Sequence, residues 1–120
     1  MRSAEQENED AMSDIHKTLA ESLFDLERAL RELELWDTEP PSNQALASTQ
    51  PFAVDTLEFY QWLQFIFIPR LFQLVEYRAG MPESCSVAPM AEEYFRPRPE
   101  SGEAVVVVLE RIDRLVTSAP

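Results

Sequence analysis

Few side chains in this sequence have the chemistry of catalysis or of metal binding. His16 is the only histidine and Cys85 the only cysteine among 120 residues, so no cysteine pair suggests a zinc site. A histidine-based triad would have to use His16, which has no nucleophile pattern near it and is better interpreted as a partly exposed helix residue. Gly80 and Gly102 are the only glycines and lie far apart, which excludes a glycine-rich phosphate loop.

Acidic pairs are the remaining candidates for a cation site. Glu92 adjoins Glu93, and Glu32 and Glu34 lie two positions apart. Such charge runs are more often solvated helix faces, and the Glu-x-x-His pairs used by di-metal helical bundles do not occur. The sequence therefore predicts no catalytic constellation, no metal site and no cofactor, and we expect a protein that is not an enzyme.

A cluster of aromatic side chains is the feature best suited to binding. Seven of the twelve aromatic residues fall between Phe52 and Phe72. They are either simply core residues or, in part, an apolar patch that Trp62 and Arg70 form near the loop at 48–52. Trp and Arg dominate interface hot spots. A buried arginine would need carbonyls or a paired acid, and Asp55 or Glu58 is available as the acid. The candidate binding residues are Ser48, Thr49, Gln50, Pro51, Phe52, Asp55, Trp62, Gln64 and Arg70.

The charge balance excludes several classes of partner. Ten basic and 22 acidic residues give a formal charge of −12, and twelve of the acids fall within residues 1–39. A surface this acidic repels phosphate backbones and anionic membranes, so we expect neither direct nucleic-acid binding nor membrane binding. The N-terminus lacks the apolar stretch of a signal peptide, and the single cysteine suits a reducing compartment. These features favour a cytoplasmic protein.

Helical periodicity runs through the first third of the chain. Ile15 and the leucines that follow it recur at spacings of three and four residues, which places them on one helix face from about Ser13 to Trp36. Pro40 and Pro41 prevent the helix from continuing. We therefore expect it to end near Trp36.

Two irregular segments flank this helix. Residues 1–10 are acidic without periodicity, so we expect a flexible tail before a single helical-bundle domain at 11–120. Residues 37–54 are rich in proline, serine and threonine and are expected to form a loop. Loops of this length in compact domains are commonly either functional or disordered.

The most apolar part of the chain follows this loop. Asp55, with Glu58 three positions later, has the form of a helix start. The residues that follow are apolar nearly all round a helix, as in a helix buried against several neighbours.

A proline divides this apolar segment. The stripe of polar residues jumps by roughly 120° around the helix between Gln64 and Arg70, and Pro69 lies inside the jump. Because proline removes a backbone hydrogen bond and clashes with the preceding turn, we expect a kinked or broken helix with pieces at 55–67 and 69–78.

The rest of the chain combines prolines with a valine tract. We expect Gly80 to end the central helix and a short helical turn to span Pro89 to Phe95. Four consecutive valines favour a strand by propensity. The apolar residues from Val105 to Val116 nevertheless fit helical spacing, and a lone strand would leave its backbone unpaired, so a helix is predicted at about 101–117.

The motifs together resemble the signature of the YqcC-like family, small bacterial proteins without an assigned function. The resemblance covers about residues 12–117 and depends on the combination, since each piece alone is weak. It implies an all-helical bundle and an association with a tRNA pseudouridine synthase of the C type, an enzyme that a chain of this length and composition cannot itself be. The motifs are Ser48-Thr49-Gln50-Pro51-Phe52, Asp55-Thr56-Leu57-Glu58, Trp62-Leu63-Gln64, Ile68-Pro69-Arg70 and Val87-Ala88-Pro89.

The sequence thus predicts an all-α protein, a four-helix bundle with a proline-kinked or broken central helix. Our first hypothesis is a helical interaction module that docks on a protein partner, such as the synthase, through the 48–52 loop and the Trp62/Arg70 region. The alternative is a small-molecule or lipid-binding bundle in which the aromatic cluster lines a pocket. A homodimer would also cover excess apolar surface on the central helix.

Overall fold

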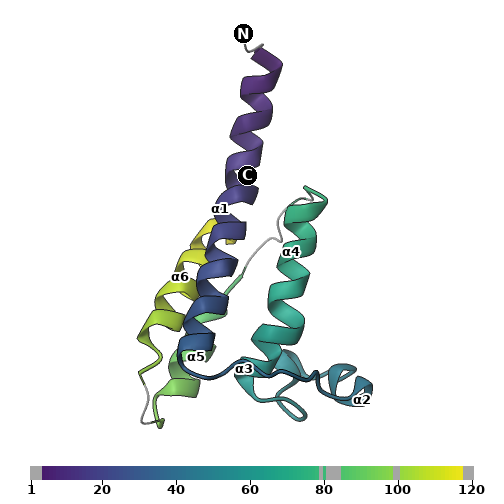
Figure 1. The fold of residues 1–120 in the computed structure, drawn as a ribbon, viewed down its shortest axis with the longest axis vertical. Helices are drawn as coiled ribbons and strands as arrows, with labels where there is room; N and C mark the ends of the chain where they lie inside the picture. The colour runs from purple at the N-terminus through teal and green to yellow at the C-terminus, as the bar shows by residue number, and fades with distance from the viewer. Residues whose placement is uncertain (1–3, 79, 81–84, 99–100, 118–120) are drawn as a thin grey trace.

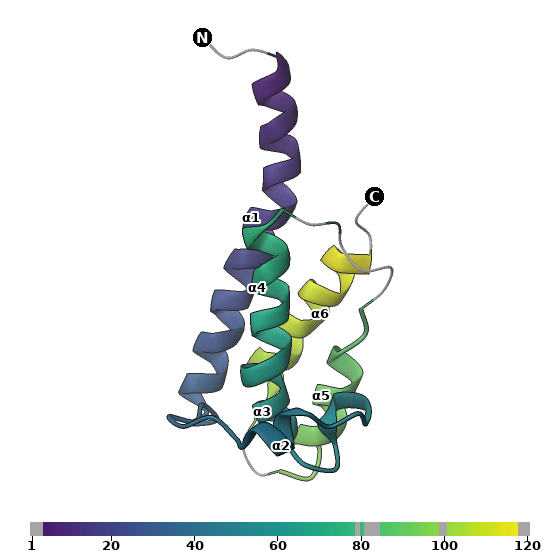
Figure 2. The same ribbon diagram turned by 90° about the vertical axis from the view of Figure 1, so that its right-hand side faces the viewer.

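The fold is all helical over the residues that the structure, a computed structural model, describes: 4–78, 80, 85–98 and 101–117. Residues 81–84 and 99–100, which include two of the prolines of the last third of the sequence, lie outside the described part. Four helical segments form the bundle, which confirms the predicted fold class (Figures 1 and 2). The elements are α1 (Ala4–Glu32), α2 (Asn43–Leu46), the 3-10 turn η1 (Pro51–Ala53), α3 (Phe59–Trp62), the π-helical turn η2 (Leu63–Phe67), α4 (Ile68–Glu76), α5 (Ala88–Phe95) and α6 (Glu103–Thr117).

Helix α1 supplies the leucine stripe that the periodicity predicts. It packs against α6 and α4, and four of its leucines are fully buried: Leu19, Leu23, Leu26 and Leu30. The helix begins at Ala4, so it includes most of the predicted tail, and its first turns project beyond the other helices (Figures 1 and 2). The molecule is therefore 53 Å long and only 30 and 26 Å across. The division into a tail at 1–10 and a domain stays a prediction.

Helix α1 ends at Glu32, before the predicted end at Trp36. Glu34 adopts a left-handed backbone conformation (φ 60°), and the N–H of Leu35 donates to the carbonyl of Leu30 at 2.9 Å. This arrangement is a Schellman cap, in which the position of Glu34 is normally filled by glycine. The turn stops the helix before the two prolines are reached.

The predicted loop at 37–54 contains the short helical turns α2 and η1. The Ser42 hydroxyl accepts a hydrogen bond from the N–H of Ala45 at 3.1 Å and so caps α2. The Thr56 hydroxyl donates to the carbonyl of Ala45 at 2.8 Å. These bonds fold the loop back against the start of the central helix.

The central helix begins at Phe59, so the predicted start at Asp55 is wrong. Glu58 forms a capping box with Gln61, whose side-chain oxygen accepts from the Glu58 N–H at 2.9 Å. The Asp55 carboxylate accepts a hydrogen bond from the Ser48 hydroxyl instead. Glu58, three positions after Asp55, also has a polar residue three positions later, Gln61, and this second pair forms the cap.

The expected discontinuity at Pro69 takes the form of a π-helical turn inside an unbroken helix from Phe59 to Glu76. In η2, the N–H of Ile68 donates to the carbonyl of Leu63, five residues back. Pro69 lies directly after this turn, as the second residue of α4, where the helix has already departed from the regular bonding that a proline interrupts. The wider turn thus accommodates the proline without ending the helix.

The π-helical turn also accounts for the shift in the polar stripe. A single π turn holds one residue more than an α turn, which rotates the following helix by about 100° relative to a regular helix. That rotation brings Arg70 close to the angular position of Glu58, and Gln73 close to that of Gln61. The polar residues before and after the turn therefore lie on one face of the continuous helix.

The valine tract is helical, as the spacing predicts. Val105 and Val108 are buried in α6, whereas Val107 is 55% exposed. The predicted turn from Pro89 corresponds to α5, which packs on α6. None of the described helices has both the length and the hydropathy needed to cross a membrane.

One carboxylate of α6 joins it to the start of α5. Asp113 accepts hydrogen bonds from the N–H groups of Val87 at 2.9 Å and Ala88 at 2.8 Å. The Cys85 thiol donates to the same carboxylate at 3.1 Å. Asp113 therefore serves α5 as a helix cap supplied from another helix.

Candidate functional site

A groove of about 330 Å³ opens where η1, the start of α3 and α5 meet. Figure 2 shows α3 and α5 at the end of the bundle opposite the projecting turns of α1. Three charged side chains line it, Glu58, Glu93 and Arg98. The remainder of its lining is apolar or aromatic: Phe52, Val54, Leu57, Phe59, Met90 and Tyr94. We call this feature the aromatic groove.

Aromatic rings in contact form the wall of the groove. The Phe52 ring meets Trp62 edge-on with centroids 4.8 Å apart, and Phe59 lies 6.1 Å from Trp62 and 5.6 Å from Tyr94. Such pairs stabilise one another beyond the area that they bury. The array therefore links η1, α3 and α5 into one preformed surface.

The turn that carries Phe52 is strained. Phe52 and Ala53 both adopt left-handed backbone conformations, with φ of 56° and 49°. Each such non-glycine residue costs about 1–2 kcal/mol, and strain of this kind concentrates at functional sites. Contacts of the Phe52 ring with Trp62 and Phe59 hold the turn in place.

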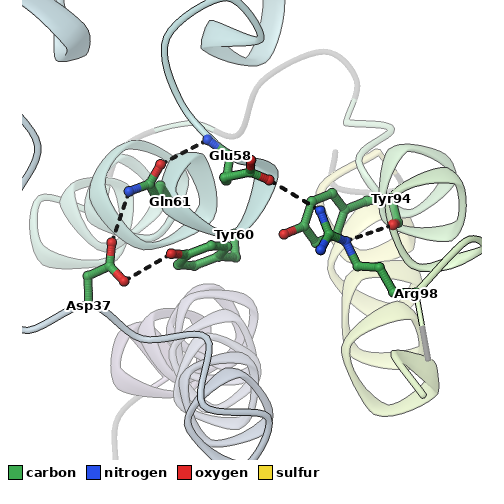
Figure 3. Close-up of polar contacts among 6 residues, drawn as sticks. All are labelled: Asp37, Glu58, Tyr60, Gln61, Tyr94 and Arg98. Atoms are coloured by element: carbon green, nitrogen blue, oxygen red, sulfur yellow. Dashed lines mark hydrogen bonds and ion pairs between the residues drawn. The ribbon is translucent and has the colours of Figure 1, made fainter. Parts of the chain in front are cut away.

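A salt bridge crosses the groove from α3 to the end of α5 (Figure 3). One guanidinium nitrogen of Arg98 donates to the Glu58 carboxylate at 3.2 Å, and its Nε donates to the carbonyl of Tyr94 at 3.2 Å. The guanidinium also lies over the Tyr94 ring, 3.9 Å from its centroid. Arg98 is thus held by a charge, a carbonyl and an aromatic face.

A second polar network begins at Asp37 and supports the back of the same helix (Figure 3). Its carboxylate accepts from the Tyr60 hydroxyl at 3.0 Å and from the Gln61 side chain at 2.9 Å. The Gln64 side chain, which is 8% exposed, bonds to both backbone groups of Asp37 at 2.8 Å. Gln64 therefore anchors the loop after α1 and is not a groove residue.

The tyrosines of the site stay protonated near neutral pH. Burial raises the pKa of Tyr94 to about 12, because burial and the nearby Glu58 charge together outweigh the lowering effect of the Arg98 charge. Burial and the hydrogen bond to Asp37 raise the pKa of Tyr60 as well. Both phenols are hydrogen-bond donors and not general bases at physiological pH.

The structure does not bring the predicted binding residues together in one place. Phe52 lines the aromatic groove with Trp62 behind its ring, whereas the Ser48 hydroxyl is used locally, by Asp55 and by the N–H of Gln50 at 3.1 Å. Thr49 is exposed and Pro51 opens η1.

Arg70 lies apart from the other predicted residues. It is exposed on α4, and neither of the acids considered for it takes that role, because Glu58 pairs with Arg98 and Asp55 with Ser48. The idea of a buried arginine paired with one of these acids is therefore wrong.

Sequence reasoning missed two residues of the site, Tyr94 in α5 and Arg98 three positions after the end of α5. Tyr94 and Arg98 are four positions apart, the spacing at which side chains meet on a helix, and this was the available signal. Their partner Glu58 lies 40 positions from Arg98, and no local pattern points to that pairing. Over the described part of the chain, no three His, Cys, Asp or Glu side chains gather where a metal ion could sit.

Family comparison places this architecture among known proteins. A family model described as "tRNA pseudouridine synthase C" matches residues 18–115. The solution NMR structure of protein YqcC from E. coli superimposes with a TM-score of 0.78 at 31% identity, covering 88% of this chain and 91% of that one.

Curated relatives fall into two groups by length. Uncharacterised protein YqcC of Escherichia coli K12 is 33% identical over 100 residues, 83% of this chain and 92% of that protein. An uncharacterised protein of Haemophilus influenzae is 37% identical over 74 residues, 62% of this chain and 70% of that protein. A protein of Pectobacterium carotovorum named tRNA pseudouridine synthase C is 45% identical over 64 residues, 53% of this chain but only 17% of that protein. The matched segment thus spans about a sixth of the Pectobacterium protein.

Proposed function

The chain belongs to the YqcC-like family, and from this membership we propose that it is a helical protein-interaction module that serves as an accessory partner of a tRNA pseudouridine synthase of the C type. Relatives of similar length are uncharacterised. The proposal assigns binding to this chain and the chemistry to its partner.

The Pectobacterium relative carries the proposal. Its name is that of the synthase, and its match to this chain occupies 17% of its length, so more than four fifths of it lies outside the match. That remainder is nearly five times as long as the matched segment, which is room for further domains. Two domains joined on one chain have a high effective concentration for each other. Such a fusion therefore favours domains that bind one another.

Charge supports the same partner. An enzyme that binds tRNA carries basic surface, because it must neutralise phosphates. This chain carries a formal charge of −12. Opposite charges accelerate the encounter of two proteins and stabilise the correct register. A bacterial cytoplasmic location for this chain, where tRNA is modified, belongs to the same proposal.

Isothermal titration of the purified chain with the C-type synthase of the same bacterium tests the function. We expect saturable binding that weakens as salt rises, since the attraction is partly electrostatic. Trp62→Ala and Arg70→Ala variants show whether the predicted surface takes part. Absence of binding at low salt would overturn the proposed function.

A small-molecule role is the second candidate, and the aromatic groove is the observation that favours it. Its volume of about 330 Å³ lies at the lower end of the range for ligand pockets. A metabolite library screened by thermal shift checks this alternative, because a ligand of the folded state raises the melting temperature. A homodimer is checked by sedimentation of the chain alone.

A further inference from the structure

We infer that the aromatic groove is the docking site on this chain for a segment of the synthase in which an apolar side chain is flanked by lysine or arginine. The inference rests on the proposed function and specifies which surface is used and what chemistry it recognises. Three features of the groove support it: an exposed apolar wall, an unneutralised acid and a preformed shape.

Val54 forms the exposed part of the apolar wall. It is 66% exposed, and it lines the groove together with Leu57 and Phe59, which are themselves buried. Single exposed apolar residues are ordinary on protein surfaces, but a patch continuous with aromatic rings at a concave site marks an interface. An apolar anchor seated here would remove both its own surface and that of Val54 from water.

The rim has a net negative charge. Arg98 is already engaged by Glu58, by a carbonyl and by the Tyr94 ring. Glu93 is exposed on α5 and has no salt bridge with any residue in the described ranges. The rim therefore offers one free carboxylate beside an apolar surface, which pairs with a basic side chain and repels RNA or an acidic peptide.

The groove is preformed. Ring contacts fix Phe52 in its left-handed turn, and three interactions fix the Arg98 side chain. A site that is already ordered loses little conformational entropy when a segment docks. These features suit the capture of a short chain segment through a central anchor.

Paired surface variants test the inference by titration of the intact synthase. Val54→Asp and Glu93→Arg change the groove, and Val107→Asp and Glu110→Arg make the same changes on exposed positions of α6 that do not line it. All four side chains are exposed, so the fold is retained, and circular dichroism with a melting curve verifies this.

We expect Val54→Asp to weaken binding at least tenfold, the effect of losing an interface hot spot. Glu93→Arg should weaken binding about three- to tenfold by slowing association. At high salt its association rate should become equal to that of the natural sequence. Both α6 variants should bind as the natural sequence does. Full affinity of the two groove variants, or equal losses in the α6 pair, overturns the inference while the proposed function stands.

A photo-reactive phenylalanine at position 54 provides a second measurement, with position 107 as its control. Cross-linking to the synthase from position 54 alone supports direct contact, and sequencing of the linked peptide should find lysine or arginine beside the apolar anchor. Linking from position 107 alone, or to a peptide without basic residues, contradicts the inference. If the natural sequence does not bind the synthase at all, the proposed function fails, and the inference fails with it.

Discussion

Single residues in left-handed conformations shape this chain more than its two glycines do. Glu34, Phe52, Ala53 and Arg78 all have positive φ, and no described glycine does. Arg78 lies two positions after the end of α4, so the left-handed residue that follows this helix is an arginine and not the predicted Gly80. Turns that other proteins build with glycine are therefore built here at a conformational cost.

Replacing Glu34 with glycine is expected to stabilise the fold. The residue is exposed and caps α1 in a left-handed conformation, so Glu34→Gly relieves backbone strain by about 1 kcal/mol, partly offset by the greater freedom of glycine in the unfolded chain. Urea unfolding should show a higher midpoint. Glu34→Ala keeps the Cβ atom and is the control, and an equal gain in that variant would assign the effect to the lost charge.

Gly102 is required for a different reason, which is contact and not conformation. A Cβ atom there would lie 2.1 Å from Cγ of the buried Phe95 ring. Gly102→Ala must displace that ring, and overpacking of this kind costs about 1–3 kcal/mol. Thermal unfolding measures the loss. Gly80→Ala, where nothing lies within 4 Å of the added atom, should melt near the natural temperature, and similar melting of both variants would contradict this account.

At the residue scale, Phe52 is the one predicted binding residue that lines the groove. Phe52 and the surrounding aromatic cluster stood out by density. Glu93, Tyr94 and Arg98 did not, because their importance depends on α5 packing beside α3, a long-range contact that no spacing encodes. Arg70 was chosen for its chemical type, and its place on α4 depends on the rotation that η2 introduces.

At the scale of elements, one aspartate determines whether α5 is held in place. Asp113→Ala removes the acceptor for two backbone N–H groups and the Cys85 thiol, and we expect a loss of about 2 kcal/mol in the free energy of unfolding. Compared with the natural sequence, the variant should show faster hydrogen exchange in α5 and little change in α1. Asp25→Ala removes only an exposed salt bridge to Arg111, so it should cost less than half as much.

The helices themselves were predictable because the spacing of apolar residues along the sequence encodes them directly. The leucine stripe of α1 and the helical valines of α6 follow from periodicity alone. Their ends and irregularities were not predictable to the same degree. The Schellman turn at Glu34 and the shift of the cap from Asp55 to Glu58 depend on tertiary packing, which decides between local signals of similar strength. The π-helical turn left a visible trace, the displaced polar stripe, but a kink or break explained that trace equally well.

At the scale of the whole molecule, stability should fall at alkaline pH. Burial and the hydrogen bond to Asp113 raise the pKa of the Cys85 thiol to about 12, from an ordinary value of 9.0, and the pKa of Tyr94 is about 12. Below pH 9 both states keep these protons, so stability is complete. Above it the unfolded chain releases the thiol proton while the folded chain retains it, which lowers the free energy of unfolding by up to about 1.4 kcal/mol per pH unit.

Urea unfolding at several pH values from 8 to 11 measures this slope. The tyrosines add to it above pH 10, where the unfolded phenols ionise. Cys85→Ser keeps a hydrogen-bond donor without the thiol ionisation, so its slope between pH 9 and 10 should be smaller. Identical slopes for the two proteins would show that the buried thiol is not responsible.

The contact of α1 with α6 has a consequence for synthesis on the ribosome. Helix α1 emerges first, yet α6, the helix against which it packs most extensively, is translated after every other described element. Helix α4 covers part of the leucine stripe earlier, but until α6 is made the part that α6 covers stays open to aggregation. The first 39 residues also hold twelve of the 22 acidic residues. Repulsion between these charges keeps nascent chains apart until α6 has been made and covers the leucines.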